Sequence, residues 1–174
     1  MKRAVCPGSF DPITFGHLDI IERASGQFDE VIVAVFVNRN KSGLFSVQER
    51  IDMIAENVKK FPNVRVDSGS GLLVEYCKKN GVQAIVKGLR AVTDFDYELQ
   101  MAQVHIQASG VETMFMATSP THSFLSSSIV KELAHYGGDV SSMVPANVNA
   151  ALKARAEVQK LSLIHISEPT RQAE

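Results

Sequence analysis

A segment near the amino terminus, bracketed by glycines, combines residue types that bind phosphate. It reads Gly8-Ser9-Phe10-Asp11-Pro12-Ile13-Thr14-Phe15-Gly16-His17 and lies between an expected strand and an expected helix. The glycines allow the backbone to turn and to approach a ligand closely. His17 falls in the first helical turn, where free N–H groups favour anions, and its imidazole can donate to a phosphate oxygen in either protonation state. A strand-turn-helix also uses glycines for purely structural reasons, so that alternative stays open for this segment alone.

A second cluster places two cations on either side of a glycine, in the run Lys87-Gly88-Leu89-Arg90. The glycine lets two positive side chains and exposed amides converge on one polyanion, and Arg90 can hold a phosphate in a bidentate fork. This chemistry suits a triphosphate. A solvated Lys/Arg pair at the end of a strand is the structural alternative.

The residues after this cluster have helical periodicity, and we expect Asp94 to cap a helix that runs to about Ser109. Two faces repeat at steps of three and four residues. The apolar face consists of Phe95, Leu99, Ala102 and Ile106. The opposite face consists of Glu98, Met101 and His105. We expect the first face to pack in the core and the second to face a ligand.

A third cluster, Ser123-Phe124-Leu125-Ser126-Ser127-Ser128, precedes an expected helix that ends near Gly137-Gly138. Three serines at a helix start offer hydroxyls and free amides to a phosphate, although one serine would suffice as a cap. Lys41, in the loop after the second expected strand, adds a point charge near the same edge. Serine-rich helix starts and loop lysines are common without function, so this cluster alone decides nothing.

The elements that must position these clusters alternate between strand and helix. Five short apolar or β-branched runs predict strands at Arg3 to Cys6, Val31 to Val37, Val64 to Asp67, Ala84 to Lys87 and Thr113 to Ala117. Between them, helical spacing with a Ser46/Glu49 capping box predicts a helix over Val47 to Val58, and Asn80-Gly81 ends another. This α/β pattern predicts a five-stranded parallel sheet with helices on both faces. All three clusters would then follow the carboxyl ends of strands, where ligands bind.

Composition excludes several classes of function. The 174 residues are 45% hydrophobic, and 18 Lys and Arg face 19 Asp and Glu, so bulk positive charge does not suggest nucleic acid or an acidic membrane as a partner. Apolar runs such as Val31 to Val37 are far shorter than the roughly 20 residues that a membrane span needs. The start of the chain lacks a signal-peptide core, and its two cysteines, Cys6 and Cys77, form no disulfide framework. We therefore expect a cytoplasmic protein.

The carboxyl-terminal residues are unlike the rest of the chain. After Lys160 the run Leu161 to Arg171 has no helical or strand pattern continuous with what precedes it. It resembles the translation of a transposon-end adapter used in preparing sequencing libraries. We therefore expect one domain over residues 1–160, followed by a tail over 161–174 that is a sequence artefact.

The combination of motifs resembles the bacterial phosphopantetheine adenylyltransferases. That family belongs to the nucleotidyltransferase superfamily with the (H/T)xGH signature, here Thr14-Phe15-Gly16-His17, and the resemblance extends from about Ala4 to Lys153. It implies a Rossmann-like fold and the penultimate step of coenzyme A synthesis, in which ATP and phosphopantetheine give dephospho-coenzyme A and pyrophosphate with Mg²⁺. The substrate phosphate would attack the α-phosphorus in line. The resemblance also implies a homohexamer built as a dimer of trimers, with the metal carried by the ATP phosphates.

The family match assigns roles to individual residues. The implied catalytic residues are His17, Ser9 and Lys41. Phosphopantetheine would contact Ser9, Lys41, Leu73, Lys87 and His105. ATP would contact Ser9, Phe10, His17, Gly88, Leu89, Arg90, Glu98, His122, Ser123, Phe124, Leu125, Ser126, Ser127 and Ser128. Two positions depart from the family pattern: Lys87 stands where many members have arginine, and His105 where we expect an asparagine that bonds the pantetheine amides.

Two alternatives remain beside this assignment. A sister nucleotidyltransferase with another phosphate acceptor would share Thr14 to His17, but it should not combine Lys87 to Arg90 with the triple serine. A nucleotide-sensing module without catalysis would keep the fold while losing His17 or Lys41, and both are present.

Overall fold

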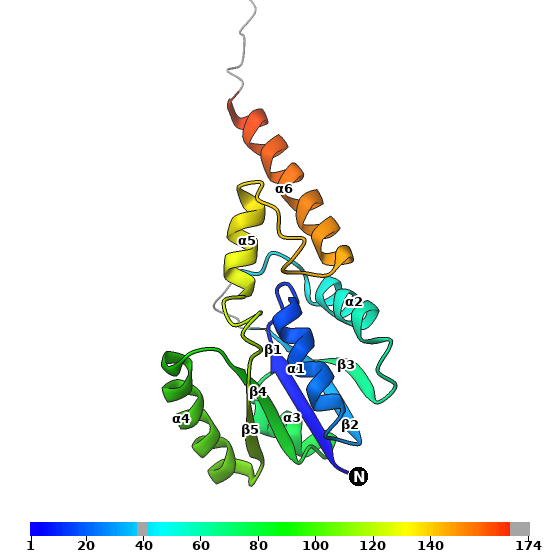
Figure 1. The fold of residues 1–174 in the computed structure, drawn as a ribbon, viewed down its shortest axis with the longest axis vertical. Helices are drawn as coiled ribbons and strands as arrows, with labels where there is room; N and C mark the ends of the chain where they lie inside the picture. The colour runs from blue at the N-terminus through cyan, green and yellow to red at the C-terminus, as the bar shows by residue number, and fades with distance from the viewer. Residues whose placement is uncertain (38–41, 168–174) are drawn as a thin grey trace, which may run out of the picture.

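The computed structural model describes residues 1–37 and 42–167 and shows an α/β fold built on one sheet (Figure 1). The five strands are β1 (Arg3–Gly8), β2 (Glu30–Phe36), β3 (Val64–Gly69), β4 (Ala84–Leu89) and β5 (Glu112–Ala117). They are all parallel and lie in the order β3-β2-β1-β4-β5. The predicted five-stranded parallel sheet is therefore confirmed, and all five carboxyl ends lie at one edge.

The centre of the sheet opens toward that edge. β1 pairs with β2 along its whole length, from Arg3 opposite Glu30 to Gly8 opposite Val35. Its pairing with β4 stops early, because only Ala4 and Val5 have register partners in that strand. β2 and β3 follow on one side of β1, and β4 and β5 on the other. The strand order therefore reverses between β1 and β4, and open α/β sheets bind ligands at such a switch point.

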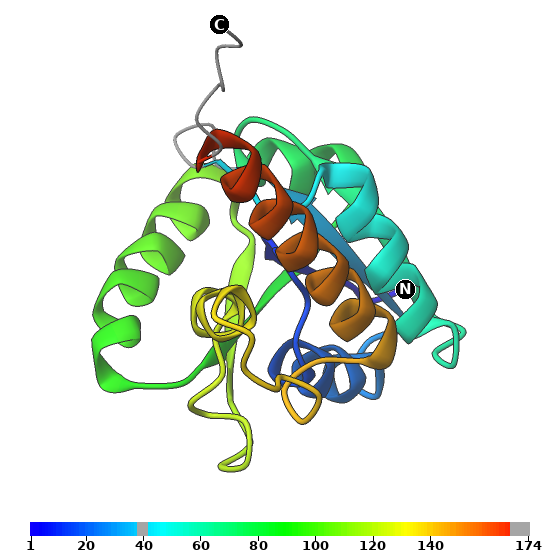
Figure 2. The same cartoon turned by 90° about the horizontal axis from the view of Figure 1, so that it is seen from above.

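Helices cover both faces, as predicted. α1 (Phe15–Ser25) and α2 (Val47–Val58) pack on one face, while α3 (Leu73–Asn80) and α4 (Val92–Ser109) lie on the other (Figure 2). The strands alternate accordingly: Cys6 of β1 belongs to the core cluster under α1 and α2, and its neighbour Val5 to the cluster under α3. α5 (Ser127–His135) and α6 (Ala146–Ser167) lie beyond the carboxyl edge, above the strands in Figure 1.

Local capping explains why two helices begin and end where the sequence predicts. At the start of α2, the Ser46 hydroxyl accepts from the Glu49 N–H at 3.2 Å, and the Glu49 carboxylate accepts from the Ser46 N–H at 2.7 Å. α3 ends at Gly81, whose φ of 61° is the left-handed conformation that glycine adopts most easily. Both predictions are confirmed.

The prediction for α4 is wrong in two respects. The helix begins at Val92 after the N-cap residue Ala91, so Asp94 lies in the first turn and is not the cap. Its apolar face is not core, because Phe95, Leu99 and Ile106 are exposed, whereas His105 on the opposite face is buried. The polar face approaches β4, since the Lys87 ammonium there lies 3.4 Å from the Glu98 carboxylate.

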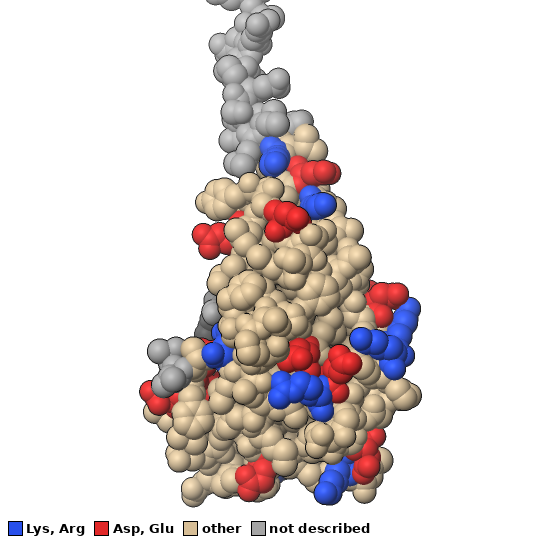
Figure 3. Space-filling view, in the orientation of Figure 1, with Lys and Arg blue, Asp and Glu red and all other residues tan. Residues whose placement is uncertain are grey.

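α6 was not predicted, and it continues past Lys160 to Ser167. The interpretation of the run after Lys160 as lacking helical structure is therefore wrong as far as Ser167. Val148 and Leu152 anchor the first half of α6 in the main core cluster, each at most 2% exposed. Within the described residues, no helix is long and apolar enough to cross a bilayer. On the face shown in Figure 3, positive and negative side chains are intermingled.

Candidate active site

A cavity of about 340 Å³ opens where β1 and β4 separate. Residues from the ends of both strands, from the start of α1 and from the start of α5 line it. They are Cys6, Pro7, Gly8, Phe10, Thr14, Gly16, His17, Ile20, Ile21, Val86, Lys87, Gly88, Arg90, Thr118, His122, Leu125, Ser126, Ser127 and Ser128. The structure therefore brings together residues from all three clusters that the sequence analysis selected. The volume of the cavity lies within the range typical of small-molecule sites.

The orientation of His17 is fixed by the residue that caps α1. Thr14 is the N-cap, and its backbone N–H donates to the Nδ1 atom of His17 at 3.0 Å. Because Nδ1 accepts this bond, the proton of the neutral imidazole must be on Nε2. His17 in this tautomer is a hydrogen-bond donor from Nε2 in a ring that lines the cavity.

The surroundings also keep that imidazole uncharged. Burial, and secondly the nearby Arg90 guanidinium, lower the pKa of His17 from 6.5 to about 4. The Phe10 ring packs edge-on against the imidazole, with ring centroids 5.1 Å apart. Of the two protonation states that the sequence left open, the structure favours the neutral one.

Lys87, Glu98 and His105 form a second group beside the cavity. Lys87 and Glu98 are half-buried and form the 3.4 Å ion pair between β4 and α4. His105 is buried near this pair, and its Nδ1 atom has no hydrogen-bond partner within the part of the chain that is described. Burial and then Lys87 lower the pKa of His105, while Glu98 opposes them. Neither Glu98 nor His105 lines the cavity, so a ligand contact by this face of α4 stays a prediction.

Arg90 makes polar contacts beside the cavity, whereas Gly88 allows close packing. The Arg90 guanidinium donates to the Leu125 carbonyl at 3.0 Å and lies 3.4 Å from the Asp94 carboxylate, so it joins the loop after β4 to the loop before α5. Gly88 lies close to α1, because a Cβ atom there would lie 3.0 Å from the Ile20 side chain, a tight contact. The close approach of β4 and α1, rather than a left-handed turn, explains this glycine.

The three serines at the start of α5 have separate positions. The Ser126 hydroxyl caps the helix by accepting from the Ile129 N–H at 3.1 Å. The Ser127 hydroxyl donates to the Pro12 carbonyl at 2.7 Å and so connects α5 to the first loop. Ser128 lines the cavity, and its hydroxyl makes no hydrogen bond within the described residues. The amides of Ser127 and Ser128 belong to the first helical turn, where N–H groups lack helical partners and can bind an anion.

Of the other predicted ATP contacts, His122 and Leu125 line the cavity, whereas Leu89, Ser123 and Phe124 do not. Leu89 ends β4, and its carbonyl accepts from the Thr118 hydroxyl at 2.9 Å. Ser123 and Phe124 are exposed in the loop before Leu125, which itself is buried and lines the cavity. His122 does line it, and its buried Nδ1 atom has no partner in the described part of the chain.

Three predicted acceptor-side residues remain. Ser9 is exposed and lies between Gly8 and Phe10, both of which line the cavity. Leu73 begins α3 and packs against the core cluster on the other face of the sheet, so it does not line the cavity. Lys41 lies outside the described residues. The roles of Leu73 and Lys41 stay predictions.

Thr14 and Thr118 also line the cavity, although neither was predicted to contact a substrate. For Thr14 a signal was present, because Thr14 and His17 have the same three-residue spacing as the Ser46/Glu49 capping box. Thr118 had no signal, since its bond to Leu89 joins residues 29 positions apart.

Comparison with known proteins agrees with the geometry. The model of the cytidylyltransferase-like family matches residues 5–133. A phosphopantetheine adenylyltransferase of Frankia alni is 60% identical over 160 residues, which are 90% of this chain and 99% of that protein. One of Streptomyces coelicolor is 63% identical over 155 residues, 89% of this chain and 98% of that protein. The chain belongs to the phosphopantetheine adenylyltransferase family. These two relatives are matched over nearly their entire length.

More distant structures share the fold of the family. A "Putative Nicotinate-nucleotide Adenylyltransferase" of Vibrio parahaemolyticus superposes with a TM-score of 0.61 at 18% identity, covering 87% of this chain and 91% of that one. A lipopolysaccharide core biosynthesis protein of Thermoplasma volcanium gives 0.53 at 22% identity, covering 68% and 97%. At these identities the similarity shows the nucleotidyltransferase-type fold only. The predicted Rossmann-like architecture is confirmed.

Proposed function

We propose that this cavity transfers the adenylyl group of ATP to phosphopantetheine, giving dephospho-coenzyme A and pyrophosphate, the penultimate step of coenzyme A biosynthesis. Curated relatives named for this activity are 60–63% identical over about nine-tenths of the chain. The structural observation that supports it most strongly is His17, a neutral donor oriented by Thr14 in a cavity that residues of all three clusters line.

The chemistry requires positioning and charge stabilisation rather than a base. A phosphate monoester is already largely ionised at neutral pH, so its oxygen can attack without losing a proton to the enzyme. That oxygen forms a bond to the α-phosphorus of ATP while the bond from the α-phosphorus to the bridging oxygen breaks. The electron pair leaves with pyrophosphate. Catalysis then depends on in-line alignment and on donors directed at the oxygens that gain charge.

Among the residues lining the cavity, His17 is the donor best suited to the α-phosphate. A neutral imidazole with its proton on Nε2 can donate a hydrogen bond to a non-bridging oxygen. Because the pKa of His17 is about 4, its protonation state does not change near neutral pH. Ser9 and Lys41 are the other two proposed catalytic residues. In this proposal His17 transfers no proton.

The two substrates would occupy different sides of the cavity. The ATP phosphates fit the amides of Ser127 and Ser128 at the start of α5, together with Arg90. The phosphate of phosphopantetheine fits Lys87, whose partner Glu98 already lies next to the ammonium. His105 and Leu73 are the proposed contacts for the pantetheine arm, and the ATP base and ribose would contact the loop from His122 to Leu125 and Glu98.

We propose Mg²⁺ as a partner of ATP rather than as a resident metal. In the described residues, no group of three or more His, Cys, Asp or Glu side chains is placed to hold a metal ion. Hydroxyls, amides and cations line the cavity instead, and this set of donors fits a metal that arrives on the triphosphate. When bound there, Mg²⁺ would neutralise charge on the phosphate oxygens.

We also propose self-association, as the homohexamer made of two trimers. Large apolar side chains are exposed on α4, where Phe95, Leu99, Val104 and Ile106 are 37–55% exposed, and on the edge strand β5, where Met114 is 47% exposed. Apolar side chains on adjoining elements of one surface support a protein contact there. Light scattering of the purified protein, with Leu99→Lys as the disrupted variant, tests this: the variant should have a smaller mass than the unchanged chain.

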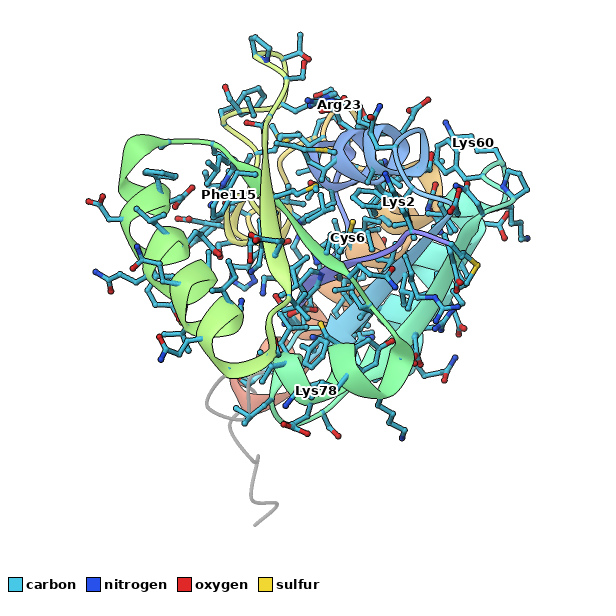
Figure 4. The ribbon with its side chains drawn as sticks, turned by 90° about the horizontal axis from the view of Figure 1, so that it is seen from below. Lys2, Cys6, Arg23, Lys60, Lys78 and Phe115 are labelled. Carbon is cyan, nitrogen blue, oxygen red and sulfur yellow. The ribbon has the colours of Figure 1, made fainter. Side chains whose placement is uncertain are left out.

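The proposed compartment is the cytoplasm. Both cysteines are free and buried, and burial raises the pKa of Cys6 to about 12 and that of Cys77 to about 11. Cys6 lies within the sheet (Figure 4). Thiols that are neither paired nor reactive fit a reducing compartment.

The test is pyrophosphate release with a panel of acceptors. The protein receives Mg²⁺-ATP and, separately, phosphopantetheine, nicotinate mononucleotide or glycerol phosphate, beside a His17→Ala variant. Release with phosphopantetheine alone, lost in the variant, is the expected result. Release with another acceptor would assign a sister reaction, and release with none would leave a nucleotide-binding module. Direct transfer further predicts no exchange of label between pyrophosphate and ATP when the acceptor and its product are absent.

A further inference from the structure

The Asp11 carboxylate is a meeting point of three elements of the fold. It is 5% exposed and accepts from the backbone N–H groups of Leu44 at 2.9 Å and Phe45 at 3.0 Å. The Lys131 ammonium of α5 donates to it at 3.1 Å, and the Arg50 guanidinium of α2 lies 3.4 Å away. Burial alone would raise the pKa of Asp11, but these backbone donors and Lys131 together hold it below its usual value.

Arg50 extends the connection to the loop that contains Ser9. It is 6% exposed, and it donates to the Phe45 carbonyl at 2.9 Å and to the Ser9 carbonyl at 3.1 Å. Its guanidinium also fills the space beside Gly43, where a Cβ atom would lie 1.8 Å from the Arg50 Nη2 atom. The segment that leads into α2 and the loop that contains Ser9 are thus fastened to each other.

Lys131 makes the corresponding connection to the ATP side. It lies in α5, one turn after the serines at the start of that helix, and the Ser127 hydroxyl joins the same loop through the Pro12 carbonyl. α5 is therefore attached to the loop from Ser9 to Pro12 at two points. A shift of α5 along its axis would break both contacts.

We propose that Asp11, through its bonds with Lys131 and Arg50, is a positioning residue that holds the acceptor side of the site in register with the ATP side. This proposal rests on the proposed adenylyl transfer and adds to it a residue that touches neither substrate. Phe10 supports it, because its φ of 45° is a left-handed conformation that residues with side chains rarely adopt. Such a conformation persists where the surrounding contacts determine it, and the bonds to Ser9 and Asp11 on either side do so.

The expected signature is a loss of rate rather than of binding. Lys131 does not line the cavity of the reaction, so removing its charge leaves the substrate contacts in place. The attacking oxygen and the α-phosphorus would instead be less well aligned, and a misplacement of about 1 Å can cost about 100-fold. A smaller shift predicts a fall in kcat of between about 10-fold and 100-fold with KM changed less than about threefold.

The first experiment compares Lys131→Met with Lys131→Arg and with a matched control. Methionine keeps the length of the side chain and removes the charge, whereas arginine keeps the charge and should restore most of kcat. The control is Lys78→Met, which removes an ion-paired lysine 3.8 Å from Glu75 on α3, at the opposite side of the molecule from α5 (Figures 1 and 4). All variants are checked by thermal melting, and kcat and KM are measured for both substrates. The proposal predicts low kcat for Lys131→Met alone, with a melting temperature close to that of the unchanged chain.

The second experiment tests whether the pair acts as a unit. Asp11→Asn removes the charge at constant volume, and the double variant with Lys131→Met should be no slower than Asp11→Asn alone. If Asp11→Asn does not fold, the Lys131 series decides by itself. Kcat of Lys131→Met within about twofold of the unchanged chain would overturn the proposal, and so would a lower melting temperature with kcat intact, because the pair would then be structural only. Inactivity of the unchanged chain and of Lys78→Met with phosphopantetheine would instead refute the adenylyl transfer on which the proposal rests.

Discussion

Lowering the pH from about 7.5 to about 5.5 should leave His17 uncharged, although an ordinary histidine would be mostly protonated at the lower value. The reason is structural: the Thr14 N–H occupies Nδ1, and burial with Arg90 nearby lowers the pKa of His17 from 6.5 to about 4. At pH 5.5 a pKa of about 4 leaves roughly 97% of the imidazole neutral, whereas a pKa of 6.5 would leave roughly 9%.

Two measurements follow this difference. The Cε1 proton resonance of His17, assigned by its loss in His17→Gln, should not move between pH 7.5 and pH 5.5. The rate of the chemical step, measured in single turnover with saturating substrates, should not fall between pH 7.5 and pH 5.5 with the titration of a group whose pKa is near 6.5. A resonance that titrates between pH 6 and pH 7, with a parallel fall in rate, would refute both the tautomer and the neutral-donor role.

The same shift affects stability, and its sign is definite. The folded state has the lower pKa, so the unfolded chain takes up a proton first as the pH falls below about 6.5. Above that pH the titration of His17 does not change the free energy of unfolding. Between pH 6.5 and pH 4 it lowers that free energy progressively. The full difference is about 3 kcal/mol. Urea unfolding of the unchanged chain should lose more stability over this range than unfolding of His17→Gln.

Three further predictions concern stability. Gly69→Ala should lower the free energy of unfolding by about 1–3 kcal/mol, because the new Cβ would lie 2.2 Å from the Phe36 ring; a melting temperature equal to that of the unchanged chain would contradict this packing. Leu152→Ala should cost about 2–5 kcal/mol in urea unfolding, since that side chain is 2% exposed in the main core; a cost below 1 kcal/mol would mean that α6 is not anchored there. Ending the chain after Lys160 should change stability by less than about 0.5 kcal/mol and leave activity unchanged, and a larger loss would show that residues 161–174 belong to the domain.

Local signals in the sequence predicted much of the fold. The Ser46/Glu49 capping box lies within four residues of chain, so it fixes the start of α2 without reference to the rest of the molecule. The strands were recognisable because a sheet buried on both faces produces continuous apolar runs. Parallel order then placed the three clusters at one edge, where the cavity was found.

The error in α4 has a physical cause. Periodicity shows that two faces exist, but it does not show which one meets the sheet. Phe95 of the apolar face packs edge-on against Phe115 of β5, with ring centroids 5.7 Å apart, but Leu99 is exposed. The face with Glu98 and His105 meets β4, where Lys87 provides a charge partner. A helix whose apolar side chains remain partly exposed departs from the pattern that an amphipathic surface helix usually shows.

The connections behind the site could not be predicted from spacing. Asp11 and Lys131 are 120 positions apart, and Asp11 and Leu44 are 33 apart. No periodicity relates residues at such separations, so only the folded chain shows that they meet. The roles of residues within one loop, such as the cap at Thr14, are in contrast accessible to sequence reasoning.

The most direct test of the account is a comparison of chemistry and binding in His17→Ala. If His17 donates to the α-phosphate mainly in the transition state, kcat with phosphopantetheine should fall by about 100-fold to 1,000-fold. The Kd for ATP, measured by calorimetry, should change by less than about threefold, because little of this interaction exists in the ground state. A fall in ATP affinity as large as the fall in kcat, or a kcat that survives the substitution, would contradict the central claim.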